Sequence, residues 1–282
     1  MATVVQSGTI PDAFSGNMGA NATSGNTVFL VVVTYNTAND TISSSSPVYA
    51  GSAVPGAAEI LTGSGVLSAF QSGQGVVYVA IWMLPNVSGG SEAVGVTVTN
   101  GLTSGIVGLL YYEVAATGRM PITDKKNSGS AADTTAVTSG ASGNITQGPE
   151  FVIGASAVWN GIPLPGSGWT SQGIGGSSPY SAAAGYQLPA SSGSSYTWSG
   201  TSGTAGPWAA GVATLYATPS GILQPRAVPG VARRRRPYPA RPFFTPVAGA
   251  NASGAAMAGT VPVLMTGRTE LISRRDGRVV QG

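Results

Sequence analysis

Short runs of apolar, β-branched and aromatic residues recur between residues 26 and 217, and this recurrence restricts the chain to an all-β fold. Glycine, proline, asparagine and serine interrupt the runs, as they do at turns between antiparallel strands. The predicted strands are 26–36, 75–85, 93–100, 105–115, 149–160, 168–174, 180–189, 194–200 and 207–217. No segment has a convincing helical pattern. We predict a jelly-roll-like antiparallel β-sandwich.

Two parts of the chain repeat one order of features: an apolar strand ending in Leu-Pro, a Ser/Gly turn, a threonine-containing strand and a long apolar strand. The aligned segments are 26–36 with 149–160, and 81–118 with 185–221. We interpret residues 26–118 and 149–217 as two related β-units, although strands rich in Gly, Ser and Thr also resemble one another by chance. Because neither unit alone buries both faces of its sheet, the two are expected to stack into one sandwich within residues 1–217.

Between the units, residues 119–148 are mostly polar and small, which predicts an exposed crossover that connects the two units. Asp124, Asn127 and Asp133 could join backbone carbonyls around calcium. They lack the dense alternating acids of an EF-hand loop, so a solvated loop is the better interpretation and no metal site is predicted.

Charge divides the chain in two. Residues 1–217 hold three basic and eight acidic residues, a net charge of −5, whereas residues 218–282 hold ten arginines and two acids, a net charge of +8. Such an asymmetry indicates a basic tail with a partner of its own.

The sequence contains no cysteine and no histidine, which excludes disulfides, thiolate metal sites and Ser-His-Asp catalysis. It also lacks a phosphate-binding G-x-x-x-x-G-K-[ST] loop. Glu113 interrupts an apolar strand and is a lone candidate for acid–base chemistry, but strand alternation places it with Tyr111 on a solvent-facing side. We predict no enzyme, no catalytic residue and no cofactor.

Tryptophan offers a better indication of binding. Trp82 and Trp208 lie within apolar strands and are predicted to fill the core. Trp159 and Trp169 flank the Gly/Pro-rich loop 160–169, where an exposed ring is less readily explained by packing. We interpret these two as candidate glycan contacts, because aromatic faces stack on sugars.

The order of strands over residues 20–218, with the Gly-Trp-Thr turn at 168–170 and the late strand that begins near Trp208, resembles the β-sandwich modules of structural proteins from tailed phages and phage-like particles. The resemblance implies a capsid decoration, head spike or minor tail protein, and some such modules bind surface polysaccharide. It brings no catalytic residues and does not extend to the basic tail.

The tail changes composition at residue 218. Prolines at 219, 225, 229, 237, 239, 242 and 246 predict an extended Pro/Arg-rich arm over residues 218–259. Residues 260–282 regain strand character, and these short strands are expected to dock onto another surface.

Three interpretations of the arm remain open: a nucleic-acid tether, a disordered tail and a protein anchor. The anchor is favoured because it uses the apolar residues of the tail, with arginines pairing to acidic partner groups and large apolar side chains filling pockets. The anchoring residues would be Arg233, Arg234, Arg235, Arg236, Arg241, Phe243, Phe244, Leu264 and Leu271.

The N-terminus lacks the pattern of a secretory signal, and the apolar runs are too short to span a bilayer, so no membrane association is expected. We therefore expect a non-enzymatic virion structural protein, assembled in the host cytoplasm as a homo-oligomer with other virion proteins. It would contact host-surface polysaccharide and not nucleic acid. A free lectin-like module is the first alternative, and a nucleic-acid-tethered structural protein is the second.

Overall fold

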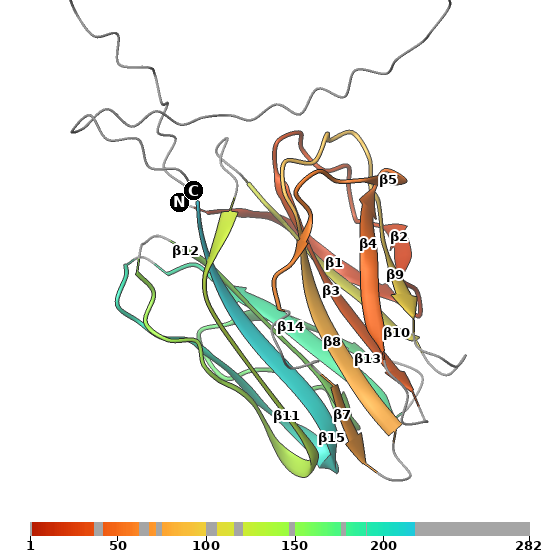
Figure 1. The fold of residues 1–282 in the computed structure, drawn as a ribbon, viewed down its shortest axis with the longest axis vertical. Helices are drawn as coiled ribbons and strands as arrows, with labels where there is room; N and C mark the ends of the chain where they lie inside the picture. Colours follow the sequence, from red (N-terminus) through yellow and green to blue (C-terminus); the bar gives the residue numbers. More distant parts are fainter. Residues whose placement is uncertain are drawn as a thin grey trace, which may run out of the picture. The chain divides into compact units, whose positions relative to one another are not determined.

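The computed structural model describes residues 2–36, 42–61, 68–71, 75–99, 106–115, 121–146, 150–175, 179–189 and 191–217. Within these ranges the chain forms antiparallel β-strands in three sheets, and no helix is present (Figure 1). The prediction of an all-β antiparallel sandwich is therefore confirmed. The predicted arm and docking strands, residues 218–282, lie outside the described residues, as do all the anchoring residues named above. In the part of the chain just defined, no helix is long and apolar enough to cross a membrane.

The first inner sheet has the order β1 (Val4–Pro11), β10 (Ile106–Val114), β3 (Thr27–Asn36), β8 (Gly75–Leu84) and β6 (Ala58–Glu59), with β7 (Ser68–Gln71) also paired to β8. The second inner sheet has the order β11 (Pro121–Ala141), β15 (Thr197–Ala217), β12 (Glu150–Trp159), β14 (Tyr180–Gln187) and β13 (Thr170–Gly175). The outer sheet has the order β2 (Ser15–Asn17), β9 (Ala93–Thr99), β4 (Ser43–Tyr49) and β5 (Ser52–Ala53).

The two inner sheets pack face to face around one core. Alternate residues of β3, such as Phe29 and Val31, meet Phe151 and Ile153 of β12 in this core. The Phe29 and Phe151 rings stack with 4.9 Å between their centroids. Because side chains alternate along a strand, the intervening residues of β3 point the other way and pack against the outer sheet. A strand covered on both faces needs apolar residues at nearly every position, which accounts for the unbroken run in β3.

The second inner sheet has its own cover on the face away from the first. β11 and β15 pair along most of their length, and residues 197–201 of β15 fold with residues 136–141 of β11 over β12. Trp198 is fully buried there and donates a 2.8 Å hydrogen bond from Nε1 to Ser156 Oγ of β12. Its ring lies so close to Gly154 that a Cβ on that residue would be 2.5 Å away.

This cover corrects two predictions. Residues 121–141 form the edge strand β11 and not a loop, although most of its residues are exposed or half-buried, and predicted strands 194–200 and 207–217 are parts of the single strand β15. The sequence did not predict β11 because its side chains face solvent at many positions and are small and polar, so the segment has the composition of a loop. Only backbone pairing with β15 makes it a strand.

The two β-units share one strand order. β10, β3 and β8 are neighbours in the first inner sheet, and their aligned counterparts β15, β12 and β14 are neighbours in the second. Across the core, β8 packs over β15 and β10 packs over β14 (Figure 1). β8 thus packs over the counterpart of β10, and β10 packs over the counterpart of β8. This exchange is what an approximate two-fold axis between the two units would produce. The two inner sheets stack on each other as predicted. In addition, each inner sheet is covered on the face that points away from the other inner sheet.

Candidate binding surface at the loop between β12 and β13

The loop formed by residues 160–169 leaves β12 through a tight turn. Asn160 and Gly161 both have positive φ angles, 61° and 82°. A side chain at Gly161 would place a Cβ 2.6 Å from the Gly203 nitrogen, so this close approach of two backbones requires glycine. The Gly203 N–H donates a 2.9 Å hydrogen bond to the Asn160 carbonyl, and the Ser181 hydroxyl donates to the Gly161 carbonyl. The start of the loop is thus fastened to β15 and β14.

The middle of the loop is held by Pro163, which is buried. Its carbonyl oxygen lies over Gly200 of β15, where an added Cβ would be 2.7 Å away. The Leu164 N–H donates a 2.8 Å hydrogen bond to the Ile162 carbonyl, which closes a three-residue turn at Pro163. The side chains of Ile162 and Leu164 nevertheless remain 45% and 52% exposed.

A depression of about 430 Å³ lies between this loop and β15. One side is apolar, formed by Ile162, Leu164 and Pro165, and the other is formed by residues 199–201 of β15. Because the loop backbone lies on the Cβ face of Gly200, alternation turns the exposed Ser199 and Thr201 side chains to the opposite, solvent-facing side. Among the residues that line it, which also include Gly166, none carries a charge. The residues that line the depression therefore form an uncharged surface that is apolar on the side of the loop.

The two tryptophans predicted to contact glycans are half-buried and do not line this depression. Trp159 packs against the inner core, with its ring edge-on to Tyr180 and 4.7 Å between centroids. Trp169 lies edge-on to Trp198 at 4.9 Å. A role in glycan contact stays a prediction for both, and each ring already has a packing partner.

The other two tryptophans were predicted to fill the core. Trp208 is buried, as predicted, and donates a hydrogen bond of 2.6 Å from Nε1 to Thr134 Oγ1. Trp82 is half-buried at the edge of the core between the first inner sheet and the outer sheet, and its Nε1 donates to Ser44 Oγ at 2.9 Å.

Glu113 was expected to face solvent, and this expectation is wrong: both Glu113 and Tyr111 are buried. The Thr23 N–H and Asn26 Nδ2 donate to Oε1 at 2.8 and 2.5 Å, and Gln6 Nε2 donates to Oε2 at 2.6 Å. The side of β10 that alternation assigns to solvent is covered by residues that precede β3 and by the outer sheet. The carboxylate therefore connects β1, β10 and the segment before β3.

Tyr78 and Glu59 form a second polar contact near the outer sheet. The Tyr78 hydroxyl lies 2.8 Å from Ser44 Oγ and donates to Glu59 Oε1 at 3.2 Å. Burial raises the pKa of Tyr78 to about 12 and also raises the pKa of Glu59, while the Tyr78 hydrogen bond and the charge of Lys126 partly oppose the increase for Glu59.

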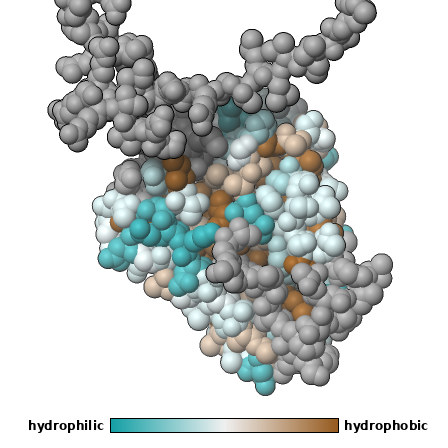
Figure 2. Space-filling view, viewed as in Figure 1, coloured by the Kyte–Doolittle hydropathy of each residue, from teal (hydrophilic) through white to brown (hydrophobic). Residues whose placement is uncertain are grey.

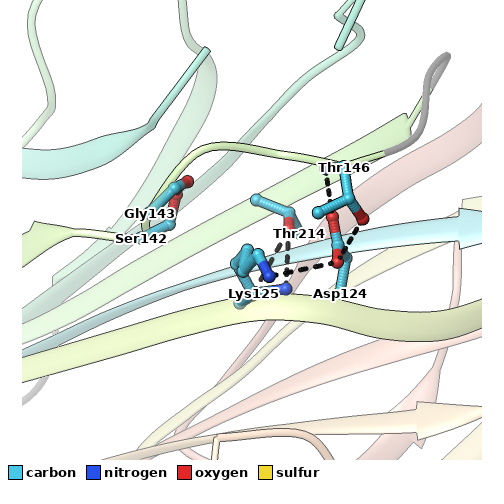
Figure 3. A network of polar contacts seen from close by, with 6 residues as sticks. All are labelled: Asp124, Lys125, Ser142, Gly143, Thr146 and Thr214. Atoms are coloured by element: carbon cyan, nitrogen blue, oxygen red, sulfur yellow. Dashed lines mark hydrogen bonds and ion pairs between the residues drawn. The ribbon is translucent and has the colours of Figure 1, made fainter. Parts of the chain in front are cut away.

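The three residues considered as calcium ligands have separate roles. Asp124 lies at an irregularity of the β11–β15 register and accepts hydrogen bonds from the N–H and hydroxyl of Thr146 at 2.7 and 2.8 Å (Figure 3). Lys125 Nζ is 3.7 Å from Asp124 Oδ1. Asn127 donates to the Ala141 carbonyl, and Asp133 is exposed. Within the described ranges, no group of three or more acidic, histidine or cysteine side chains is placed to hold a metal ion.

Comparisons with protein-family models, with curated proteins and with solved structures give no match for this chain. The resemblance to phage modules therefore stays a prediction. The depression was missed from the sequence, although apolar residues between the turn residues of loop 160–169 were a usable signal. Nothing in the sequence pattern indicated that Ser199 and Thr201 would lie beside that loop.

Proposed function

We propose that this chain is a non-enzymatic structural protein of a virion, located on the capsid or head surface as a decoration or spike, or on the tail. The arginine-rich arm attaches the β-sandwich to other virion proteins, and the assembled form is a homo-oligomer. One observation carries the proposal: the net charge changes sign where β15, the last strand among the described residues, ends at Ala217. The acidic part of the chain is folded on its own core, and the basic part follows it.

The chemistry of arginine supports an anchoring role. The planar guanidinium holds a carboxylate through two parallel hydrogen bonds, even where water is partly excluded. An arm without a core of its own costs about 1–2 kcal/mol per residue to order, which a large partner surface offsets. Residues such as Phe243 and Phe244 supply the apolar part of that interaction.

The test is co-expression of the chain with the genes that flank its own, followed by gradient sedimentation of the particles. Truncation after Pro219 should leave a folded body that no longer sediments with particles. Replacement of Arg233–Arg236 by alanine should weaken attachment in a salt-sensitive way, more at low salt than at high salt, since ions at high salt already screen the arginine charges of the wild type. Replacement by lysine keeps the charge and is the matched control for bidentate pairing. Normal occupancy of the truncated chain would contradict the proposal.

A free lectin-like module is the second candidate, favoured by the uncharged depression beside loop 160–169. Size-exclusion chromatography with light scattering, together with a glycan array, separates the two. A monomer with strong glycan affinity and no particle association supports the lectin. Protection of nucleic acid by the arm inside particles supports the third candidate, a nucleic-acid tether.

A further inference from the structure

We propose that Tyr35 and Tyr180 are a site of oxidative cross-linking, at which a one-electron oxidant joins the two rings through a carbon–carbon bond. The product is dityrosine. Tyr35 belongs to β3 of the first inner sheet and Tyr180 to β14 of the second, so the bond connects the two β-units. The proposal rests on the geometry of the inner core and is independent of the proposed function.

The rings of Tyr35 and Tyr180 are stacked face to face within the inner core. Their centroids are 3.5 Å apart and their planes are inclined by 15°. Aromatic pairs ordinarily prefer offset or edge-on arrangements with centroids ~4.5–7 Å apart, because the face of each ring is negative. The surrounding core therefore holds two electron-rich faces closer than the electrostatics of the rings alone would favour. Carbons of one ring are in van der Waals contact with carbons of the other, at about 3.5–4.0 Å.

This contact is what the coupling of two phenoxyl radicals requires. Each phenol gives one electron to the oxidant and its proton to water. The unpaired electron of each radical is shared with the ring carbons next to the one that bears oxygen, and one such carbon from each ring forms the new bond. The hydrogens on the joined carbons then move to the phenolic oxygens, which restores both aromatic rings. Two electrons and two protons leave in all, so two equivalents of the one-electron oxidant are consumed.

The surroundings of the pair favour coupling over other reactions of the radicals. Tyr35 and Tyr180 are only 9% and 3% exposed, which separates the radicals from other chains and from reductants in solution. β3 ends at Asn36, one residue after Tyr35, and β14 begins at Tyr180. Because both residues lie at strand ends, the rings can tilt from the stack into the bonded arrangement. Burial, and secondly the neighbouring Tyr35, raise the pKa of Tyr180, so the phenol keeps its proton until it is oxidised.

Trp159 gives a path by which the electron leaves the core. Its ring lies edge-on to Tyr180 with 4.7 Å between the centroids, and it is half-buried. An oxidant that reaches the indole can therefore oxidise the pair without entering the core. Cysteine and histidine, which compete for such oxidants, do not occur in the sequence. Much of the visible face of the body has the pale colour of weakly polar residues, with hydrophobic areas in small separate spots (Figure 2).

A second tyrosine pair in the same core offers a comparison. Tyr112 and Tyr186 lie with their centroids 5.7 Å apart and their planes at 73°. One ring meets the other by its edge, so the ring carbons that would couple do not face one another. A bond between Tyr35 and Tyr180 would restrict the unfolded chain as a disulfide does, in a sequence that has no cysteine.

The experiment oxidises the full-length chain with a ruthenium tris-bipyridine complex and persulfate under visible light, and the blue fluorescence of dityrosine reports coupling. Trypsin then cuts the denatured chain at Arg119, Lys125 and Lys126, which separates the two β-units unless a bond joins them. The wild type should give joined fragments whose mass is that of the two fragments less two hydrogens.

Four variants identify the residues that couple. Tyr35→Phe and Tyr180→Phe keep the ring but remove the phenol, and each should abolish the joined fragments. Tyr112→Phe is the matched control at the edge-on pair and should leave their yield unchanged. Flash photolysis tests the electron path: the indolyl radical should decay as the phenoxyl radical appears, and Tyr180→Phe should slow that decay. Trp159→Phe should slow cross-linking by the ruthenium complex.

Several results would overturn the proposal: no joined fragments from the folded chain, an undiminished yield in Tyr35→Phe, a loss of joined fragments in Tyr112→Phe, or an equal yield from a chain oxidised in concentrated urea. Dityrosine found only between separate chains, as dimers on denaturing gels, would also overturn it. A higher urea midpoint after oxidation of the wild type, absent in Tyr35→Phe and in Tyr180→Phe, supports the bond between the two β-units.

Discussion

Gln6 donates a 2.6 Å hydrogen bond from Nε2 to Oε2 of Glu113, 107 positions later in the chain. The same carboxylate accepts from the Thr23 N–H and from Asn26 Nδ2, and it is fully buried. Three neutral donors thus converge on one carboxylate that joins the N-terminal strand to β10. This arrangement makes Glu113 a residue of structural importance.

Replacement of Glu113 should destabilise the protein. In Glu113→Gln, the new amide group faces the amide of Gln6, and we expect a loss of about 1–3 kcal/mol in the free energy of unfolding. Glu113→Ala leaves three donors without this acceptor, of which Asn26 is buried, and should cost about 3 kcal/mol. Urea denaturation measures both. The control Asp133→Asn, at an exposed position, should change stability by less than about 0.5 kcal/mol. Equal stability of Glu113→Ala and the wild type would refute this role.

Gly200 should be intolerant of a side chain. Gly200→Ala places a Cβ 2.7 Å from the Pro163 carbonyl oxygen, so the loop must move away from β15. We expect the free energy of unfolding to fall by about 1–3 kcal/mol and amide hydrogen exchange in residues 160–169 to become faster. Gly166→Ala is a matched control in the same depression, since an added Cβ there meets nothing within 4 Å and its φ is not positive. If both variants behave alike, the close contact does not hold the loop.

Glu59 should make stability depend on pH. Burial raises its pKa above the ordinary 4.5, so the folded protein favours the neutral acid. The contribution of Glu59 to the free energy of unfolding is therefore fully present when the pH is below its ordinary pKa. This contribution is lost as the pH rises through the raised pKa of the folded state. Glu59→Gln stays neutral and should therefore gain stability relative to the wild type as the pH increases. Denaturation midpoints from about pH 4 to about pH 8 test the trend, with Asp12→Asn at an exposed position as control. A constant difference across this range would contradict the assignment.

Trp169 should affect ligand adsorption through packing. Trp169→Ala removes the ring that lies edge-on to Trp198, and it should lower both stability and sugar binding. Trp169→Phe keeps an aromatic ring at that position and should restore most of both. Urea denaturation and saccharide titration of the same variants distinguish a packing role of Trp169 from direct contact with the sugar. Loss of binding in Trp169→Ala at unchanged stability would indicate direct stacking on the sugar instead.

The strands with apolar and aromatic residues could be predicted from the sequence. β3, β8, β10 and β12 lie close to their predicted positions, because an apolar run between turn residues is a local property of the chain. The long polar strand β11 could not be predicted in this way. Its side chains are mostly small and polar, so only its backbone pairing with β15 identifies it as a strand. The same holds for the serine-rich strand β4, which pairs with β9.

The sequence by itself determined an all-β fold, a division between an acidic body and a basic tail, and the set of side chains that share each face of a strand. Tertiary structure alone decided which faces are covered. Glu113 is buried because other segments lie over its face, and the depression exists because loop 160–169 lies beside residues 199–201 of β15. The physical reason is that alternation along a strand fixes the direction of side chains, whereas burial depends on segments distant in sequence, whose packing no local pattern specifies.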